Sequence, residues 1–180
     1  MRGGRLVPLP RARTVAFVAV LAAALLAGAG PASAARTCSS STSWGTNRPD
    51  LAAQVVALVN AYRSARGLPR LAPSRSLTAS SVWKSLHMAR YRYFAHDDPG
   101  PPAMRPAFRR ARDCGYAGAV WGENIAWGYP TARAVVRGWL GSPSHRASIE
   151  NPSFTTTGVG VAARPGGSLY WTQEFGSRTG

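Results

Sequence analysis

In the first half of the chain, apolar side chains recur at the three- and four-residue spacing of amphipathic helices. One helix is predicted to begin at Asp50, a residue type that caps helices, and to end at Gly67, a residue type that terminates them. A second is predicted to begin at Ser74 or Ser76 and to end near Tyr93. Each helix should bury one face in a shared core.

The next part of the chain alternates short helices with one extended segment. A short helix is predicted at 108–114 and an extended segment at 116–127, where small and aromatic residues follow one another without a helical stripe. Thr131 is expected to cap another helix, and Ser142-Pro143 to open a short one, because proline is tolerated in a first helical turn.

Two β-rich runs close the chain. They cover 155–162 and 169–175, and the Pro-Gly-Gly-Ser sequence at 165–168 between them predicts a hairpin turn. The complete order of elements is helix, helix, strand, helix, strand, strand. This order predicts an α+β fold in which helices cover a small central antiparallel sheet.

The first 34 residues have the parts of a secretory signal peptide. Arginines precede an apolar run from Val15 to Ala27, and Ala32-Ser33-Ala34 supplies the small residues of a cleavage site. The run is short for a membrane span, and no second one follows. We therefore expect a secreted, extracellular protein with no transmembrane segment in its mature form. The predicted parts are a signal peptide (1–34), a leader rich in Ser and Thr (35–49) and one domain (50–180).

The chain is strongly basic. Of its 22 basic residues four lie before residue 35, and all seven acidic residues lie after it. The excess is almost entirely arginine, spread along the chain, which is typical of GC-rich coding. No basic cluster alternates with stacking aromatics, so we expect no specific nucleic-acid partner. Attraction to an anionic cell-wall polymer is the partner that this charge favours.

The chain has two cysteines, Cys38 and Cys114. An even number in an exported protein predicts a disulfide. Because this bond would close a long loop, it would stabilise the fold by about 4 kcal/mol in the chain-entropy model.

Glu123 is the most unusual polar residue, because it interrupts an apolar run with a tryptophan on each side. A buried carboxylate requires backbone amides, an imidazole or a metal as partner. One interpretation is purely structural, with Glu123 tying loops together. The other joins it to His96, in an acidic Pro-Gly turn, and to His145, near a helix start. These three could hold Zn²⁺ or another divalent cation, or form an acid–base set. His87 is expected to be an ordinary helix histidine.

Six stretches have the character of family motifs. They are Leu58-Val59-Asn60-Ala61-Tyr62-Arg63, Tyr93-Phe94-Ala95-His96, Gly122-Glu123-Asn124-Ile125-Ala126, Trp139 with Ser142-Pro143-Ser144-His145-Arg146-Ala147, Val159-Gly160-Val161, and Tyr170-Trp171-Thr172-Gln173-Glu174-Phe175-Gly176. In this order they resemble the CAP superfamily, also called SCP or TAPS, and most closely its short bacterial secreted branch. The resemblance covers roughly residues 52 to 176.

The resemblance implies an α-β-α sandwich with a central cleft, where some members bind zinc or another divalent cation. His96 and His145 match the two histidines of that cleft, and Glu123 matches the glutamate of Gly-Glu-Asn. Larger family sites carry a second glutamate near the tryptophan that Trp139 matches, but no acid flanks Trp139 here. We expect at most three protein ligands, or a Glu123 that orients an imidazole or a bound water from behind.

Two classes of function follow. The favoured one is a secreted binding module, because the resemblance implies ligands such as a sterol or lipid. The alternative is a metal-assisted peptidase or cell-wall hydrolase with Glu123 as base. A serine hydrolase is disfavoured, because Ser142 and Ser144 lie near His145 without a Gly-x-Ser-x-Gly elbow. The tryptophans expected to pack in the core, rather than to form a carbohydrate platform, are Trp83, Trp127, Trp139 and Trp171.

Overall fold

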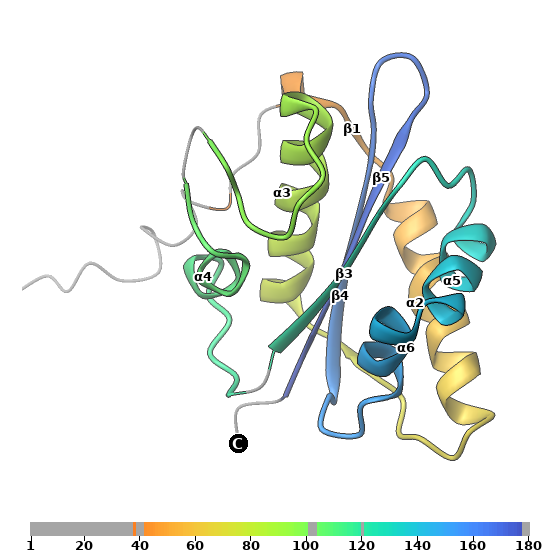
Figure 1. The fold of residues 1–180 in the computed structure, drawn as a ribbon. Coiled ribbons are helices and arrows are strands. Elements are labelled where there is room, and N and C mark those ends of the chain that lie inside the picture. Colours follow the sequence, from red (N-terminus) through yellow and green to blue (C-terminus); the bar gives the residue numbers. More distant parts are fainter. Residues whose placement is uncertain (1–37, 39–41, 101–103, 120, 178–180) are drawn as a thin grey trace, which may run out of the picture.

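The computed structural model describes residues 38, 42–100, 104–119 and 121–177 of the 180-residue chain. Its helices are η1 (Thr42–Trp44, a 3-10 turn), α2 (Pro49–Ser64), α3 (Arg75–Tyr91), α4 (Ala107–Asp113), α5 (Ala132–Gly141) and α6 (Pro143–Glu150). Helices α3 and α4 lie on one side of a central sheet, and α2, α5 and α6 lie on the other (Figure 1). This arrangement confirms the predicted α+β class and α-β-α sandwich.

The strands are β1 (Thr46–Asn47), β2 (Ala72–Pro73), β3 (Trp121–Trp127), β4 (Thr156–Ala163) and β5 (Leu169–Gly176). Their order is β1-β4-β5-β3 with antiparallel neighbours, and β2 pairs in parallel with one end of β4. Strands β4 and β5 form the predicted hairpin. Strand β3 comes last in this order, so one of its edges faces no other strand of the described sheet.

Two glycines bring α3 close to the sheet. A side chain at Gly158 or Gly160 of β4 would collide with the backbone of α3. Without one, the hydroxyl groups of Ser81 and Ser85 donate to the carbonyls of Gly158 (3.0 Å) and Gly160 (2.9 Å). These contacts fix α3 against the sheet, and the loop that follows α3 carries His96.

Three of the four tryptophans expected in the core are buried, namely Trp83, Trp139 and Trp171. The expectation is wrong for Trp127, which exposes 56% of its surface. Trp127 is the last residue of the edge strand β3, and its ring stacks on Tyr170 with the centroids 6.2 Å apart. An edge position gives such a ring a neighbour on one side and solvent on the other.

The predicted boundaries need two corrections. Helix α2 begins at Pro49 after Arg48, and Asp50 lies within the first turn instead of capping it. The Arg48 guanidinium donates to both Asp50 oxygens, at 2.9 and 2.6 Å. The segment predicted as extended at 116–127 is a strand only from Trp121. An isolated sequence cannot show where strand pairing stops, since the partner β5 sets that limit.

Part of the predicted leader, residues 35–49, belongs to the domain. The ring of Trp44 packs edge-on against a buried tryptophan of α3, and β1 pairs with β4. Cys38 forms the predicted disulfide with Cys114, the residue directly after α4. The predicted signal peptide, 1–34, lies outside the described residues. Within the described part of the chain, every helix is too short or too polar to cross a membrane.

Candidate functional site

Two of the three predicted site residues are in direct contact. Glu123 lies on β3, His96 lies in the loop after α3, and His96 Nδ1 donates to Glu123 Oε1 over 2.8 Å. The imidazole is 53% exposed, whereas the glutamate side chain is 1% exposed. The carboxylate therefore orients the ring from behind, and the second ring nitrogen, Nε2, is left for a ligand.

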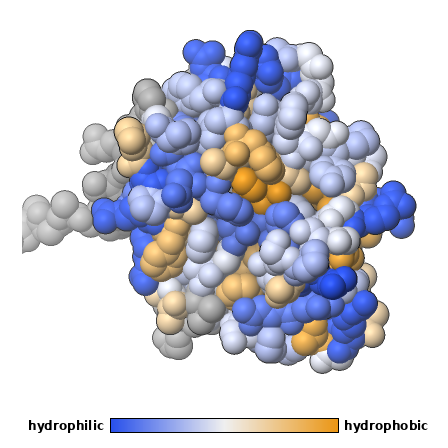
Figure 2. All heavy atoms as spheres, in the orientation of Figure 1, coloured by the Kyte–Doolittle hydropathy of each residue, from blue (hydrophilic) through white to orange (hydrophobic). Residues whose placement is uncertain are grey.

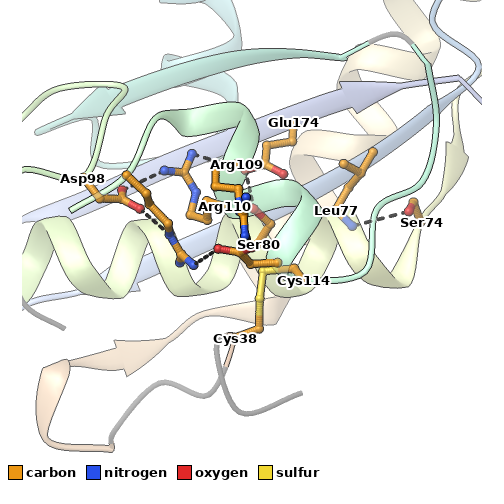
Figure 3. Close-up of a disulfide and its surroundings, with 11 residues drawn as sticks. Cys38, Ser74, Leu77, Ser80, Asp98, Arg109, Arg110, Cys114 and Glu174 are labelled. Atoms are coloured by element: carbon orange, nitrogen blue, oxygen red, sulfur yellow. Dashed lines mark hydrogen bonds and ion pairs between the residues drawn. A yellow bond between two sulfur atoms is a disulfide. The ribbon is translucent and has the colours of Figure 1, made fainter. Parts of the chain in front are cut away.

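Arg110 of α4 holds the other oxygen of Glu123. Its fully buried guanidinium donates from Nη2 to Glu123 Oε2, and from Nη1 to Asp98 Oδ1 over 2.7 Å. Nη1 also donates to the carbonyl of His96 at 3.2 Å. One side chain thus positions both the glutamate and the loop that carries the histidine. Figure 3 shows Arg110 between Asp98 and Glu174, close to the disulfide.

A network of buried charges continues beneath this contact. Asp98 also accepts from Lys84 (2.9 Å) and from Arg105 (3.0 Å), and Arg105 pairs in turn with Asp113 (2.9 Å). A buried charge costs several kcal/mol unless it is paired, so each member of the network depends on the others. The connected ion pairs join four cations, Lys84, Arg105, Arg109 and Arg110, to the carboxylates of Asp98, Asp113 and Glu123.

A fourth carboxylate, Glu174, lies directly opposite Glu123 on the neighbouring strand β5. Its Oε1 accepts from Ser80 Oγ at 2.7 Å and from Arg110 Nη2 at 3.4 Å. Complete burial outweighs the attraction of Arg110 and, together with the charge of Glu123, raises the pKa of Glu174 to about 8. With this pKa, Glu174 keeps its proton at neutral pH.

His145 approaches the same edge of β3 from the other helical layer. It lies in the first turn of α6, its Nδ1 is hydrogen-bonded to Ser142 Oγ at 2.8 Å, and its carbonyl accepts from Asn124 at 3.1 Å. Burial, followed by the positive charge of His96, lowers the pKa of His145 below its usual value. The two imidazoles therefore interact electrostatically, while each uses Nδ1 for a protein partner of its own.

A pocket of about 270 Å³ opens beside His145 along the free edge of β3. The aromatic residues Phe94 and Trp127, which line it, expose 52% and 56% of their surfaces. Figure 2 shows an apolar patch near the centre of the visible face, with hydrophilic residues around it. Aromatic surface exposed beside a concave pocket is typical of a ligand site. The other lining side chains include Ile125, Tyr129 and Trp139.

The predicted residues fit a metal site only in part. The Glu123 carboxylate is buried and engaged by His96 and Arg110, so it is not placed as a ligand equal to the imidazoles. Among the described residues, no group of three or more His, Cys, Asp and Glu side chains could hold a metal ion. The metal shared by all three residues stays a prediction. A site formed by His96 and His145, with Glu123 orienting one ring, is likewise a prediction.

The sequence did not direct attention to Arg110 or to Asp98. Two signals were nevertheless present. Lys84 is the single lysine in the chain, and it falls within the predicted second helix. Glu174 is the single charged residue of the last predicted strand, as Glu123 is of β3. Their partners come from α4 and its preceding loop, and no spacing rule relates these segments to β3 or α3.

Residues 56–175 match the model of the CAP family, described as the cysteine-rich secretory protein family. This chain belongs to the CAP family. It is 40% identical over 124 residues to the uncharacterized protein YkwD of Bacillus subtilis (strain 168), a match covering 68% of this chain and 45% of YkwD. It is 31% identical to the uncharacterized membrane protein YlbC of the same organism, covering 33% of that protein. The chain thus spans less than half the length of these curated relatives.

Two solved structures agree with the fold. An extracellular SCP-domain protein from Bacillus anthracis superposes with a TM-score of 0.66 at 30% identity, covering 72% of this chain and 41% of that chain. An outer surface protein from Borrelia burgdorferi has a TM-score of 0.67 at 18% identity, covering 75% of this chain and 99% of that one. The second likeness concerns the fold alone.

Proposed function

We propose that this CAP domain is an exported binding module that takes an amphipathic ligand, such as a sterol or lipid, in the pocket along the free edge of β3. The supporting observation is the exposure of Phe94 and Trp127 in a pocket that the imidazole of His145 also lines. The apolar body of the ligand would cover the two aromatic rings. Its polar group would accept or donate a hydrogen bond at Nε2 of His145, the histidine that lines this pocket.

The excess of basic side chains supports a place of action at or outside the cell wall. Without the predicted signal peptide, 18 basic and seven acidic residues remain, so the exported protein would be attracted to an anionic wall polymer. Such attraction weakens as ionic strength rises, because exposed charges are screened beyond about 8 Å at physiological salt. Retention on isolated cell walls should therefore fall steeply with added salt, whereas binding in the pocket should not.

The experiment is a titration of the purified protein with the fluorescent sterol dehydroergosterol and with cis-parinaric acid, followed by probe anisotropy. Phe94→Ala and Trp127→Ala should each weaken binding about tenfold or more, as expected of central aromatic contacts. Met104→Ala is the matched control, because Met104 is an apolar residue 80% exposed outside this pocket. The proposal would be refuted if neither probe showed saturable binding. It would also be refuted if both aromatic substitutions left the affinity for the probes unchanged.

A divalent cation is a second proposed ligand of the cleft, supported by the free Nε2 atoms that the two Nδ1 contacts leave. Calorimetric titration with zinc at neutral pH should give heat that His96→Ala or His145→Ala removes. Glu123→Gln should weaken this binding without abolishing it, because Glu123 orients the His96 ring from behind. An absence of heat with the parent protein would refute the cation proposal. It would leave the proposal of a sterol or lipid ligand unaffected.

Hydrolysis is the less favoured function. Glu123, the predicted base, is 1% exposed and directed at Arg110. It is therefore poorly placed to activate a water beside a substrate. Incubation with peptidoglycan and with casein, with and without zinc, should release no products. Product release that Glu123→Gln abolishes would replace the binding module with the hydrolase.

A further inference from the structure

A second pocket, of about 360 Å³, opens beside β4, at the edge of this strand that faces away from β5. Ala53 and Val56 of α2 line it from one layer of helices, and Thr78 and Val82 of α3 line it from the other. Val159 of β4 also belongs to its lining. None of the described lining residues carries a charged side chain. The pocket therefore suits an uncharged and mainly apolar ligand, because it offers no partner to a carboxylate, a phosphate or an amine.

Two short strands cover this edge of β4, and each covers only one end of it. Strand β2 pairs with Thr156 and Thr157, whereas β1 pairs with Ala162 and Ala163. Residues 158–161 of β4 lie between the two pairings, which leaves a gap of about 13 Å at the usual rise of a strand. Figure 1 shows α2 and α3 on opposite faces of the sheet, so the gap opens between the two helices.

The backbone of Val159 faces this gap. Successive residues of a strand direct their N–H and C=O groups to opposite edges. The carbonyls of Thr157 and Val161, two residues to either side, accept at this edge from the amides of Ser74 (2.9 Å) and Arg48 (2.8 Å). Val159 has the same orientation, and among the described residues no strand lies opposite it. Its N–H and C=O therefore lack a strand partner, and backbone groups of this kind require one from a ligand or from water.

We propose that this pocket binds a short extended peptide with small apolar side chains. One peptide residue opposite Val159 can exchange both N–H···O bonds with it, as directly opposed residues of antiparallel strands do. The gap has room for about three residues. Gly158 and Gly160 face α3, so the side chain of the central peptide residue would lie on the α2 side with that of Val159, and its neighbours would face α3. This site shares no residue with the pocket along β3, and either can fail without the other.

The test is an NMR titration of ¹⁵N-labelled protein with the neutral peptide acetyl-Ala-Val-Ala-amide. The amide resonance of Val159 should shift and saturate. The same peptide methylated at its three residue nitrogens keeps the side chains but cannot donate to the Val159 carbonyl, so it should bind about tenfold more weakly or worse. Ala53→Leu should remove the saturable shift, because the larger side chain would occupy part of the pocket. Ala57→Leu is the matched control, since Ala57 is exposed one turn further along α2 and does not line the pocket.

The methylated peptide separates pairing with the strand from simple apolar contact. The proposal is overturned if the parent peptide gives no saturable shift at Val159, which would leave the gap to water. It is also overturned if the methylated peptide binds as tightly as the unmethylated one, since backbone hydrogen bonds would then contribute nothing. Unchanged binding to the Ala53→Leu protein would place the peptide elsewhere and would overturn the proposal as well.

Discussion

Arg110 donates to the carboxylate of Glu123 from inside the protein, while His96 contacts the same carboxylate from the solvent side. A residue predicted to be a ligand or a base is thus the middle member of a chain that runs from a buried cation to an exposed imidazole. The orientation of His96 depends on how α4 packs against α3 and the sheet. The stability of the fold and the shape of the cleft should therefore respond to the same substitutions.

Replacement of Arg110 by Met should destabilise the protein by about 3–5 kcal/mol, because buried Asp98 and Glu123 would each lose a cation. Urea denaturation measures this change. Arg109→Met is the matched control on the same helix. The Arg109 side chain is 70% exposed and pairs with Asp113 at 2.7 Å, so its loss should cost less than about 1 kcal/mol. Equal costs for the two substitutions would contradict the buried network.

Removal of the disulfide should lower the free energy of unfolding by about 4 kcal/mol, because the bond closes a loop of 76 residues in the unfolded chain. The double substitution Cys38→Ser with Cys114→Ser tests this in urea. The parent protein under reducing conditions should unfold at the same denaturant concentration as the double variant. If the oxidised parent and the variant unfold together, the bond does not constrain the unfolded state as proposed.

Glu174→Gln should flatten the pH dependence of stability. Burial raises the pKa of Glu174 from 4.5 to about 8, so between these values the folded state keeps a proton that the unfolded chain has released. The stabilisation from this group is complete below about pH 4.5 and is lost as the pH rises through about 8. Glutamine stays neutral, so the variant should lack this decline. Urea denaturation from pH 5 to 8 measures this decline in the free energy of unfolding. If that free energy changed equally with pH in the parent and the variant, the raised pKa of Glu174 would be excluded.

Gly160→Ala should destabilise the fold by about 1–3 kcal/mol, because the new methyl group would meet the backbone of Ser81 and push α3 away from β4. Gly141→Ala is the control. Gly141 lies at the end of α5, and no atom lies within 4 Å of the added carbon. The stability of this variant should therefore equal that of the parent or rise slightly. Thermal denaturation compares the two. An unaffected Gly160→Ala protein would show that the helix can shift without cost.

Local patterns were sufficient for much of the architecture. The helical stripe around Val55 and Val59, the caps at Ser74 and Thr131, and the turn between β4 and β5 each depend on neighbours within a few residues. Such interactions have fixed spacings, so a sequence reports them directly. The ordered motifs then predicted the family, and with it the proximity of His96 and Glu123 that the structure contains.

The sequence by itself therefore determined the elements, their class of packing and the disulfide pair. Tertiary structure decided which charges are buried. Arg109 and Arg110 are adjacent and chemically identical, yet one is 70% exposed and the other fully buried. The difference arises because α4 turns one face toward Asp98, Glu123 and Glu174. These three residues lie on separate segments of the chain that the fold brings together. Coulomb attraction between buried groups depends on distance in space, and spacing along the chain carries no record of that distance.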